Sequence, residues 1–316
     1  MVGRSAVFRS VERLISQIAM YEAPVLVQGE TGTGKDLAAR AIHYASARRN
    51  RPFVPVNCGA LPDSLIDNEL FGHARGAFTD ARDDQPGLVA LAAQGTLFLD
   101  EIDALTIRGQ VTLLRFLQDH HFRPLGGRGE QVADVRIIAA SNRCLEDLVA
   151  AGTFRQDLFY RLRLLEVTMP PLRERRDDMA ELAAHFVQVA SVRFGKQPLP
   201  VHSDTLAWFE RYDWPGNVRE LEHVIYREFL LAEGPVISIV PPNGLRSSGT
   251  STAAQEESLN YLMAKKRAIN DFESRFLTRL IEKTDGNISA AARLCGTERR
   301  HLGRLLRKHQ MTKHFS

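Results

Sequence analysis

The chain has 316 residues, 44% hydrophobic and 25% charged, which is the ordinary balance of a globular protein that folds in water. Its apolar runs are much shorter than the roughly 20 residues that span a bilayer, and its first residues lack the apolar core of a secretory signal. The three cysteines (Cys58, Cys144 and Cys295) are widely spaced, which argues against a disulfide framework and a zinc site. We therefore expect a cytoplasmic protein with no membrane partner.

The net charge of +3 is unevenly distributed along the chain. Residues 257–316 contain 13 Lys and Arg against 6 Asp and Glu, a balance of +7, which leaves −4 for residues 1–256. A basic tail on a slightly acidic body favours contact with a polyanion. On charge alone, a solvated charged helix explains the tail equally well.

Up to about residue 171, short β-branched runs alternate with helical patterns. The runs predict strands at 25–28, 53–57, 96–99, 135–140 and 165–169, and the patterns predict helices at 37–47, 110–118 and 145–151. Strands that alternate with helices indicate an α/β fold with a parallel sheet covered on both faces.

From residue 178 to about 232 the pattern is helical only. It predicts a small all-helical subdomain with helices at 179–194, 203–212 and 218–231, the last behind a turn and N-cap signal at Trp214-Pro215-Gly216-Asn217. Residues 241–256 are rich in Pro, Gly, Ser and Thr and predict a flexible linker. A long helical pattern (259–283), a turn (284–287) and two short helices follow.

A glycine-rich segment follows the first predicted strand and opens a predicted helix, which is the context of a P-loop. Its residues are Gly29, Glu30, Thr31, Gly32, Thr33, Gly34, Lys35 and Asp36. Glycines let the backbone wrap around phosphate oxygens, and the helix N-terminus offers free N–H groups to them. We predict that the segment binds ATP and Mg²⁺, with Lys35 on the β- and γ-phosphates. Asp36 replaces the usual Ser or Thr magnesium ligand, and we expect its carboxylate to hold the metal through water.

The strand at 96–99 leads into two acids, Asp100 and Glu101, as in a Walker B element. In that role Asp100 holds the Mg²⁺ shell and Glu101 polarises the attacking water, although acids after strands also cap helices. Ser141 and Asn142 end the next strand, where a polar pair senses the γ-phosphate; a turn-forming Asx residue would look the same. Together these segments predict an ATPase.

Further motifs carry a family resemblance. They are ELFGHARGAFTDA (69–81), VNCGAL (56–61), GTLFLDE (95–101), FRQDLFYRL (154–162), PPLRERRDD (170–178) and WPGNVREL (214–221). With the P-loop, they make residues 2 to about 235 resemble the AAA+ activators of sigma-54 RNA polymerase, the bacterial enhancer-binding proteins. The resemblance implies an AAA+ P-loop core with a helical lid, assembled into a hexameric ring.

The resemblance also assigns roles to single residues. Arg155 and Arg161 match the trans-acting arginine fingers, which stabilise charge on the phosphoryl group of a neighbouring subunit's ATP. Arg219 matches the lid arginine that senses nucleotide, and Asn57 matches the residue that hydrogen-bonds the Walker B glutamate. Residues of these types also serve as ordinary surface or capping residues.

The loop that would contact the sigma factor is Gly76, Ala77, Phe78, Thr79, Asp80 and Ala81. In the family this loop rises during the ATP cycle, and its Phe-Thr pair touches sigma-54. Asp80 stands where the family motif has its second glycine, and Asp tolerates positive φ better than most residues. We therefore predict sigma-54 contact with altered strength or gating, with neutral variation as the alternative.

The end of the chain has helix-turn-helix spacing and resembles the all-α Fis-type DNA-binding domain. Gly296 permits the turn, Leu302, Leu305 and Leu306 form an apolar stripe, and Cys295 takes a core position. The residues expected to contact double-stranded DNA are Arg299, Arg300, Arg304, Arg307 and Lys308. Fis-type domains bind as dimers, and residues 259–280 are expected to contribute to the dimer interface.

The expected domains are an AAA+ α/β subdomain (1–172), a lid (173–237), a linker (238–258) and the DNA-binding domain (259–316). The expected function is ATP-driven activation of sigma-54 RNA polymerase from an upstream DNA site. A DNA-binding regulator that keeps the AAA+ core without remodelling sigma-54 is the alternative, and an AAA+ remodeller unrelated to transcription conflicts with the C-terminal segment. Because the AAA+ pattern begins almost at Met1, we expect control by a regulatory protein in trans or by expression, unless the chain is truncated.

Overall fold

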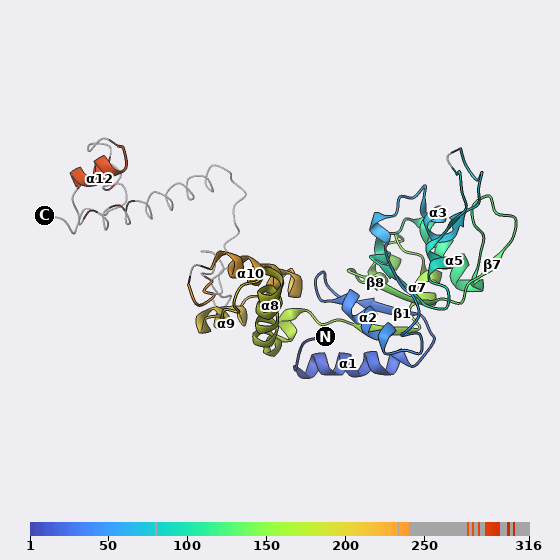
Figure 1. Cartoon of the computed structure of the whole chain (residues 1–316), viewed down its shortest axis with the longest axis horizontal. Coiled ribbons are helices and arrows are strands. Elements are labelled where there is room, and N and C mark those ends of the chain that lie inside the picture. The colour runs from blue at the N-terminus through green and yellow to red at the C-terminus, as the bar shows by residue number, and fades with distance from the viewer. Residues whose placement is uncertain are drawn as a thin grey trace. The chain divides into compact units, whose positions relative to one another are not determined.

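The computed structural model describes residues 1–79, 81–232, 234–239 and 288–297, together with Leu277, Leu280, Thr284, Leu302, Gly303 and Leu306. The chain divides into two units, 1–247 and 248–316 (Figure 1), and each is described by itself. The linker predicted from sequence lies outside the described residues from 240 on. So do Asp80 and the predicted DNA contacts Arg299, Arg300, Arg304, Arg307 and Lys308.

The core of the first unit is a five-stranded parallel sheet with the strand order β2-β5-β8-β1-β9. The strands are β1 (Val25–Gln28), β2 (Phe53–Asn57), β5 (Thr96–Asp100), β8 (Arg136–Ser141) and β9 (Leu165–Thr168). The central strands are buried on both faces, as their continuous apolar sequence requires. The predicted α/β fold class is confirmed, although β5 runs on to Asp100 and β8 begins and ends one residue later than expected.

Helices cover both faces of this sheet (Figure 1). Alternate residues of one strand face opposite layers, so Val25 and Val27 pack with α1 (Ala6–Ala19) and α2 (Lys35–Tyr44), whereas Leu26 packs in the other layer. That other layer is made by the remaining helices of the subdomain. They are α3 (Ile66–Phe71), α4 (Leu88–Leu91), α5 (Ile107–Asp119), α6 (Leu145–Ala150) and α7 (Gln156–Leu162).

Several helix limits differ from the sequence prediction. The helix expected at 37–47 begins at Lys35 and ends at Tyr44. The helix expected at 110–118 starts at Ile107, because the Thr106 hydroxyl accepts a hydrogen bond from Gly109 N and caps it. The sequence prediction assigned no helix to α1 or α7.

The helical lid consists of α8 (Met179–Phe194), α9 (Ser203–Phe209) and α10 (Asn217–Leu231), packed around the fully buried Trp214. The predicted all-helical character is confirmed. The predicted N-cap is wrong, because Gly216 precedes α10 without a side-chain cap. Asn217 is the first helical residue, at φ 51°, and its side chain donates to Glu30 instead of capping the helix.

No helix in the described part of the chain is long and apolar enough to cross a membrane.

In the second unit, α12 (Ile288–Leu294) ends in the turn predicted from sequence. Gly296 has φ 67°, and Thr297 N donates to Ala292 O at 3.0 Å, which closes the helix in the manner of a Schellman motif. Ala291, Ala292, Leu277, Leu280, Leu302 and Leu306 form a buried cluster, and Cys295 is half-buried against it. The described part of the apolar stripe is therefore core, as expected.

The start of α1 is tied to the start of the lid by one buried carboxylate. Asp178, at the end of η4 (Arg176–Asp178), accepts hydrogen bonds from Arg4 N and Ser5 N at 2.7 Å and from Ser5 Oγ at 2.8 Å. Asp178 and Ser5 are both buried, so no water can replace the carboxylate at the Ser5 N–H and O–H groups.

We predict that Asp178→Ala lowers the free energy of unfolding by about 3 kcal/mol, because the loss of a charged acceptor leaves buried donors unpaired. Urea denaturation of the variant and of the matched control Asp177→Ala, whose residue is exposed, measures the difference. Equal midpoints for the two variants would contradict the role of Asp178.

Candidate nucleotide site and output loop

The P-loop connects β1 to α2, and its glycines take conformations that other residues adopt at a cost. Gly32 has φ 79° and Gly34, the N-cap of α2, has φ 99°. A Cβ built on Gly32 would lie 2.3 Å from Gly216 O, so a glycine is also needed for the close approach of the lid.

Lys35 is buried at the centre of the site, with 7% of its surface exposed. Its Nζ donates to Gly29 O at 2.8 Å, Glu30 O at 3.0 Å and Asn142 Oδ1 at 2.5 Å. Burial lowers the pKa of the ammonium, and the negative charges of Asp100, Asp103 and Glu101 oppose that shift. The structure thus brings the predicted P-loop lysine, strand-end acids and sensor asparagine together.

The acids lie where β5 ends. Burial raises the pKa of the Asp100 carboxyl, whose Oδ1 accepts from Glu101 N at 2.9 Å. Glu101 sits at φ 53°, a strained conformation that is frequent at functional sites. Asp103, which the sequence analysis missed, accepts from Ser141 Oγ at 2.8 Å and from Asn142 N at 3.3 Å. It lies in η2 (Ile102–Ala104) and holds the predicted sensor pair in place.

This donor set fits a magnesium nucleotide. Asp100 would offer a half-buried carboxylate, a hard oxygen donor, and a divalent cation beside it would lower its raised pKa. Asp36 is directed to Arg40 instead, with Oδ2 2.9 Å from Nε and both side chains partly exposed. Burial chiefly raises the pKa of Asp100, and the nearby negative charge of Asp36 adds to that shift, so Asp36 lies close enough to Asp100 for a contact through water.

Asn57 and Glu101 meet beside the same glycine. Asn57 Oδ1 accepts from Gly59 N at 2.8 Å and caps η1 (Cys58–Ala60). A Cβ on Gly59 would lie 2.9 Å from Glu101 Oε2 and 3.2 Å from Asn57 Oδ1. The two side chains are neighbours, but this structure gives no hydrogen bond between these two described residues.

The arginines assigned by resemblance lie differently. Arg155 pairs with Asp157 at 2.6 Å, and Arg161 donates to Leu117 O and Gln118 O at 3.1 and 3.2 Å, so both bind their own subdomain away from the P-loop. Arg219 lies at the P-loop: its backbone N is 3.3 Å from Gly32 O, and its side chain is exposed.

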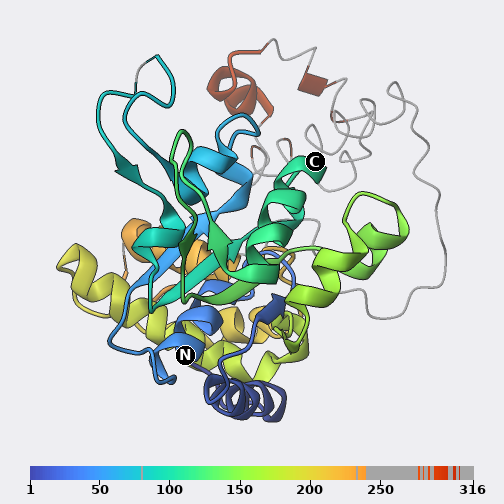
Figure 2. The ribbon, with the colours of Figure 1, turned by 90° about the vertical axis from the view of Figure 1, so that its right-hand side faces the viewer.

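The predicted output loop lies between β3 (Gly72–His73) and β4 (Gln85–Pro86), which pair antiparallel. The Phe78 side chain is 46% exposed, and its ring centroid is 4.8 Å from that of His73. A second ribbon, β6 (His121–Phe122) with β7 (Gln131–Val132), lies beside it in both views (Figures 1 and 2). Ala74 N donates to Leu125 O at 2.8 Å, which joins the two loops near their bases.

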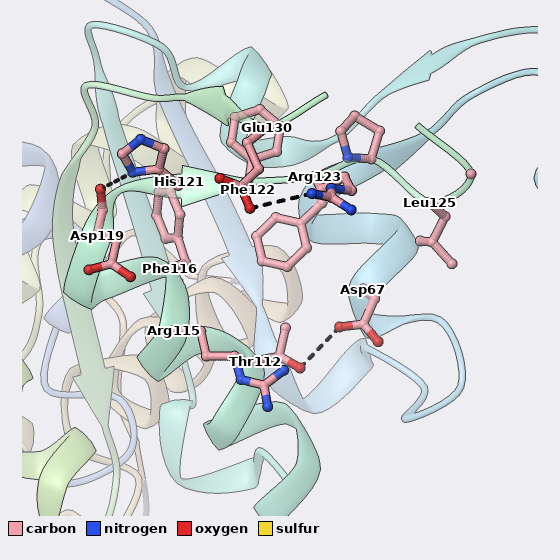
Figure 3. A pocket seen from close by; sticks show the side chains of 13 residues that line it. Asp67, Thr112, Arg115, Phe116, Asp119, His121, Phe122, Arg123, Leu125 and Glu130 are labelled. Atoms are coloured by element: carbon pink, nitrogen blue, oxygen red, sulfur yellow. Dashed lines mark hydrogen bonds and ion pairs between the residues drawn. The ribbon is translucent and has the colours of Figure 1, made fainter. Parts of the chain in front are cut away.

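A cavity of about 930 Å³ lies between α3, α5 and the second ribbon (Figure 3). Its wall contains the Arg123–Glu130 ion pair and the hydrogen bond from Thr112 Oγ1 to Asp67 Oδ1. No P-loop residue lines it. The cavity therefore belongs to the loop region and not to the nucleotide site.

Comparison with known proteins identifies the family. Residues 1–168 match the family model described as Sigma-54 interaction domain. The chain belongs to the sigma-54 interaction domain family. Residues 173–257 match the AAA+ ATPase lid domain, and residues 268–309 match the Bacterial regulatory protein, Fis family. The family suggested by the sequence motifs is thereby confirmed, as is the AAA+ core with a lid and a C-terminal helix-turn-helix domain.

The relatives of this chain include transcriptional regulators. It is 42% identical to the regulatory protein AtoC of Escherichia coli over 91% of this chain and 62% of that protein. It is 43% identical to the hydrogenase transcriptional regulatory protein HoxA of Bradyrhizobium diazoefficiens over 96% of this chain and 63% of that protein. The structure of NtrX from Brucella abortus with ADP is similar, with a TM-score of 0.70 and 32% identity over 98% of this chain and 68% of that one. The chain spans about six tenths of the length of these curated relatives.

On the lid side of the P-loop, Glu30 forms an ion pair that sequence analysis did not assign. Its carboxylate accepts from Arg173 Nη1 at 2.8 Å and from Nη2 at 2.5 Å, and from Asn217 Nδ2 at 3.1 Å. The Arg173 and Asn217 hydrogen bonds lower the pKa of Glu30 to about 2. Arg173 and Asn217 lie in two of the family motifs, 170–178 and 214–221, and those motifs are the feature of the sequence that could have pointed to this contact.

The Glu30 pKa predicts a specific pH dependence. The folded value of about 2 lies below the ordinary 4.5, so the ionised carboxylate stabilises the fold fully above pH 4.5, and this contribution is lost as the pH falls from 4.5 toward 2. The difference in unfolding free energy between the wild type and Glu30→Gln should be constant above pH 5 and shrink below 4.5. Urea denaturation at pH 7, 5, 4 and 3.5 measures it; a difference that grows on acidification would contradict the assigned pair.

Proposed function

We propose that this chain is an ATP-hydrolysing transcription activator that binds upstream DNA and remodels sigma-54 RNA polymerase from the closed to the open complex in the bacterial cytoplasm. The observation that carries the proposal is the convergence of Lys35, Asn142, Asp100 and Glu101 at one edge of the sheet. It lies in a chain whose first 168 residues match the Sigma-54 interaction domain.

In the proposed reaction, the P-loop backbone and the Lys35 ammonium bind the phosphates of ATP, and Asn142 orients that ammonium by its hydrogen bond. Asp100, with Asp36 through water, would hold Mg²⁺, which neutralises charge developing on the phosphates. Glu101 takes a proton from the attacking water, and Ser141 with Asn142 reports the γ-phosphate. Arg219 completes the site from the lid.

The proposal includes assembly. Arg155 and Arg161 lie away from the P-loop of their own protomer, which suits residues that act on a neighbour's nucleotide in a hexamer. The Fis-type segment would bind double-stranded DNA as a dimer through Arg299, Arg300, Arg304, Arg307 and Lys308. The proposed division into subdomain, lid, linker and DNA-binding domain is the one expected from sequence.

The first test is in vitro transcription from a supercoiled sigma-54 promoter. ATP should support open complexes and a non-hydrolysable analogue should not. Lys35→Met should lower ATP hydrolysis about a hundredfold or more, as the loss of a preorganised charge does, while the surface control Lys196→Met keeps wild-type activity. Open complexes that form equally well with both nucleotides would contradict the motor function; none with either would favour a DNA-binding regulator that does not remodel sigma-54.

The second test concerns position 80. The exposed Phe78 with Thr79 is the proposed sigma-54 contact, and Asp80 adds a negative charge beside it. We expect Asp80→Gly to change the rate of ATP-driven open-complex formation while ATP hydrolysis without polymerase stays the same, because the loop lies outside the nucleotide site. Equal open-complex rates would support neutral variation at this position.

A further inference from the structure

Four consecutive residues of the P-loop are bound by the lid and by the segment that leads into it. The Glu30 carboxylate accepts from Arg173 and Asn217, Thr31 O accepts from Asn217 Nδ2 at 3.0 Å, and Gly32 O accepts from Val218 N at 3.0 Å and Arg219 N at 3.3 Å. Thr33 O accepts from Arg175 Nη2 at 3.1 Å. The lid therefore binds carbonyls and one side chain of the loop, whereas a P-loop binds phosphate through its N–H groups.

The N-cap residue of α10, Gly216, has no side chain that could accept from the first N–H groups of the helix. Its first N–H groups would be unpaired without an acceptor, and Gly32 O accepts from two of them, Val218 N and Arg219 N. A P-loop carbonyl therefore takes the place of the missing N-cap. The approach depends on Gly32, because a side chain there would overlap Gly216 O.

Asn217 is committed to this contact by both its backbone and its side chain. It is fully buried at φ 51°, a conformation that Asn adopts more readily than most residues. Its Nδ2 donates to Glu30 Oε2 and Thr31 O, and its Oδ1 accepts from Leu172 N at 2.8 Å. The side chain thus joins the P-loop, the segment before the lid at Leu172 and the first turn of α10.

We propose that Glu30, Arg173 and Asn217 form a clamp that fixes the first turn of α10 to the P-loop and so positions Arg219 over the bound nucleotide. This inference rests on the proposed binding of ATP. The three are positioning residues: they act on the nucleotide through the loop and through Arg219. Phosphates bind the N–H groups of the P-loop, whereas the lid binds its carbonyls and the Glu30 side chain. Both can therefore bind at once. An intact clamp then favours nucleotide binding, and bound nucleotide in turn favours the contact between lid and P-loop.

Two partly exposed ions alone would carry little energy. The Arg173 and Glu30 side chains are 38% and 44% exposed, but the fork is bidentate and shares its carboxylate with the buried Asn217 amide. Arg175 belongs to the same segment before the lid. It is buried, and its guanidinium lies 4.9 Å from the centre of the Phe8 ring, which holds this segment against α1. The clamp is therefore a network, and we expect its members to couple energetically.

The test uses Glu30→Gln, Arg173→Met, the pair together, Arg173→Lys, and Asn217→Gly, which keeps the positive φ and removes the side chain. The matched control is Arg163→Met, which breaks partly exposed ion pairs with Glu146 (2.6 Å, 38% and 39% exposed) and Glu166 (2.7 Å) but none of the hydrogen bonds between the P-loop and the lid. Each single clamp variant should weaken ADP and ATP binding about tenfold, in the range of coupling between contacting residues. The double variant should bind nucleotide no more weakly than the weaker-binding of the two single variants. The affinity of Arg173→Lys should lie between those of the wild type and Arg173→Met, and Arg163→Met should bind as the wild type does.

Hydrogen exchange of the amides of Val218 and Arg219 in the nucleotide-free protein is the second readout. These amides should exchange about tenfold faster in the clamp variants than in the wild type or Arg163→Met, because their acceptor Gly32 O is no longer held in place. If the wild type takes up no nucleotide, the proposed function fails, and unchanged exchange would then overturn the clamp as well. If the wild type binds ATP, then additive losses in the double variant, or wild-type affinity in every clamp variant, overturn the clamp alone.

Discussion

The site depends on one buried ammonium. Lys35 is removed from water at the start of α2, and a buried charge is tolerated only where oxygen atoms and opposite charges surround it. Two P-loop carbonyls and Asn142 Oδ1 supply the contacts, and the acids after β5 supply the field. The strand order puts β8 between β5 and β1, so Asn142, after β8, lies between those acids and the P-loop. The order of the strands in the sheet therefore determines which side chains surround the ammonium.

Features that are local in the chain could be predicted from the sequence. The P-loop, the acids after β5 and the turn at Gly296 each need particular residue types at adjacent positions, and each lies where expected. Helix α1 also had a local signal, since Phe8, Val11, Ile15 and Ile18 recur at helical spacing on its buried face, but the sequence analysis did not use it.

The parts that sequence analysis missed depend on distant partners. Asn217 resembles an N-cap in sequence, but its amide bonds Glu30, 187 positions away, and α10 is capped by the carbonyl of Gly32. Asp103 looks like a helix-start acid, and only the neighbouring strand β8 shows that it holds Ser141 and Asn142. The spacing of residues in the sequence shows which face of a helix or strand a side chain lies on. It does not show which distant segment the fold brings to that face, and the contacts of Asn217 and Asp103 depend on that segment.

The nucleotide site and the exposed loop are joined by continuous structure. Glu101 and Asn57 both approach Gly59, and η1, which contains that glycine, packs against η2 beside the acids. From η1 the chain leads into α3, which packs on α4 and α5 and ends at Phe71, directly before Gly72, the first residue of the ribbon. Gly72 and Gly87 approach so closely that a Cβ on Gly87 would lie 2.4 Å from Gly72 N, which fixes the base of the loop. Packing and chain connectivity therefore link Glu101 and Asn57 to the base of the loop that carries Phe78.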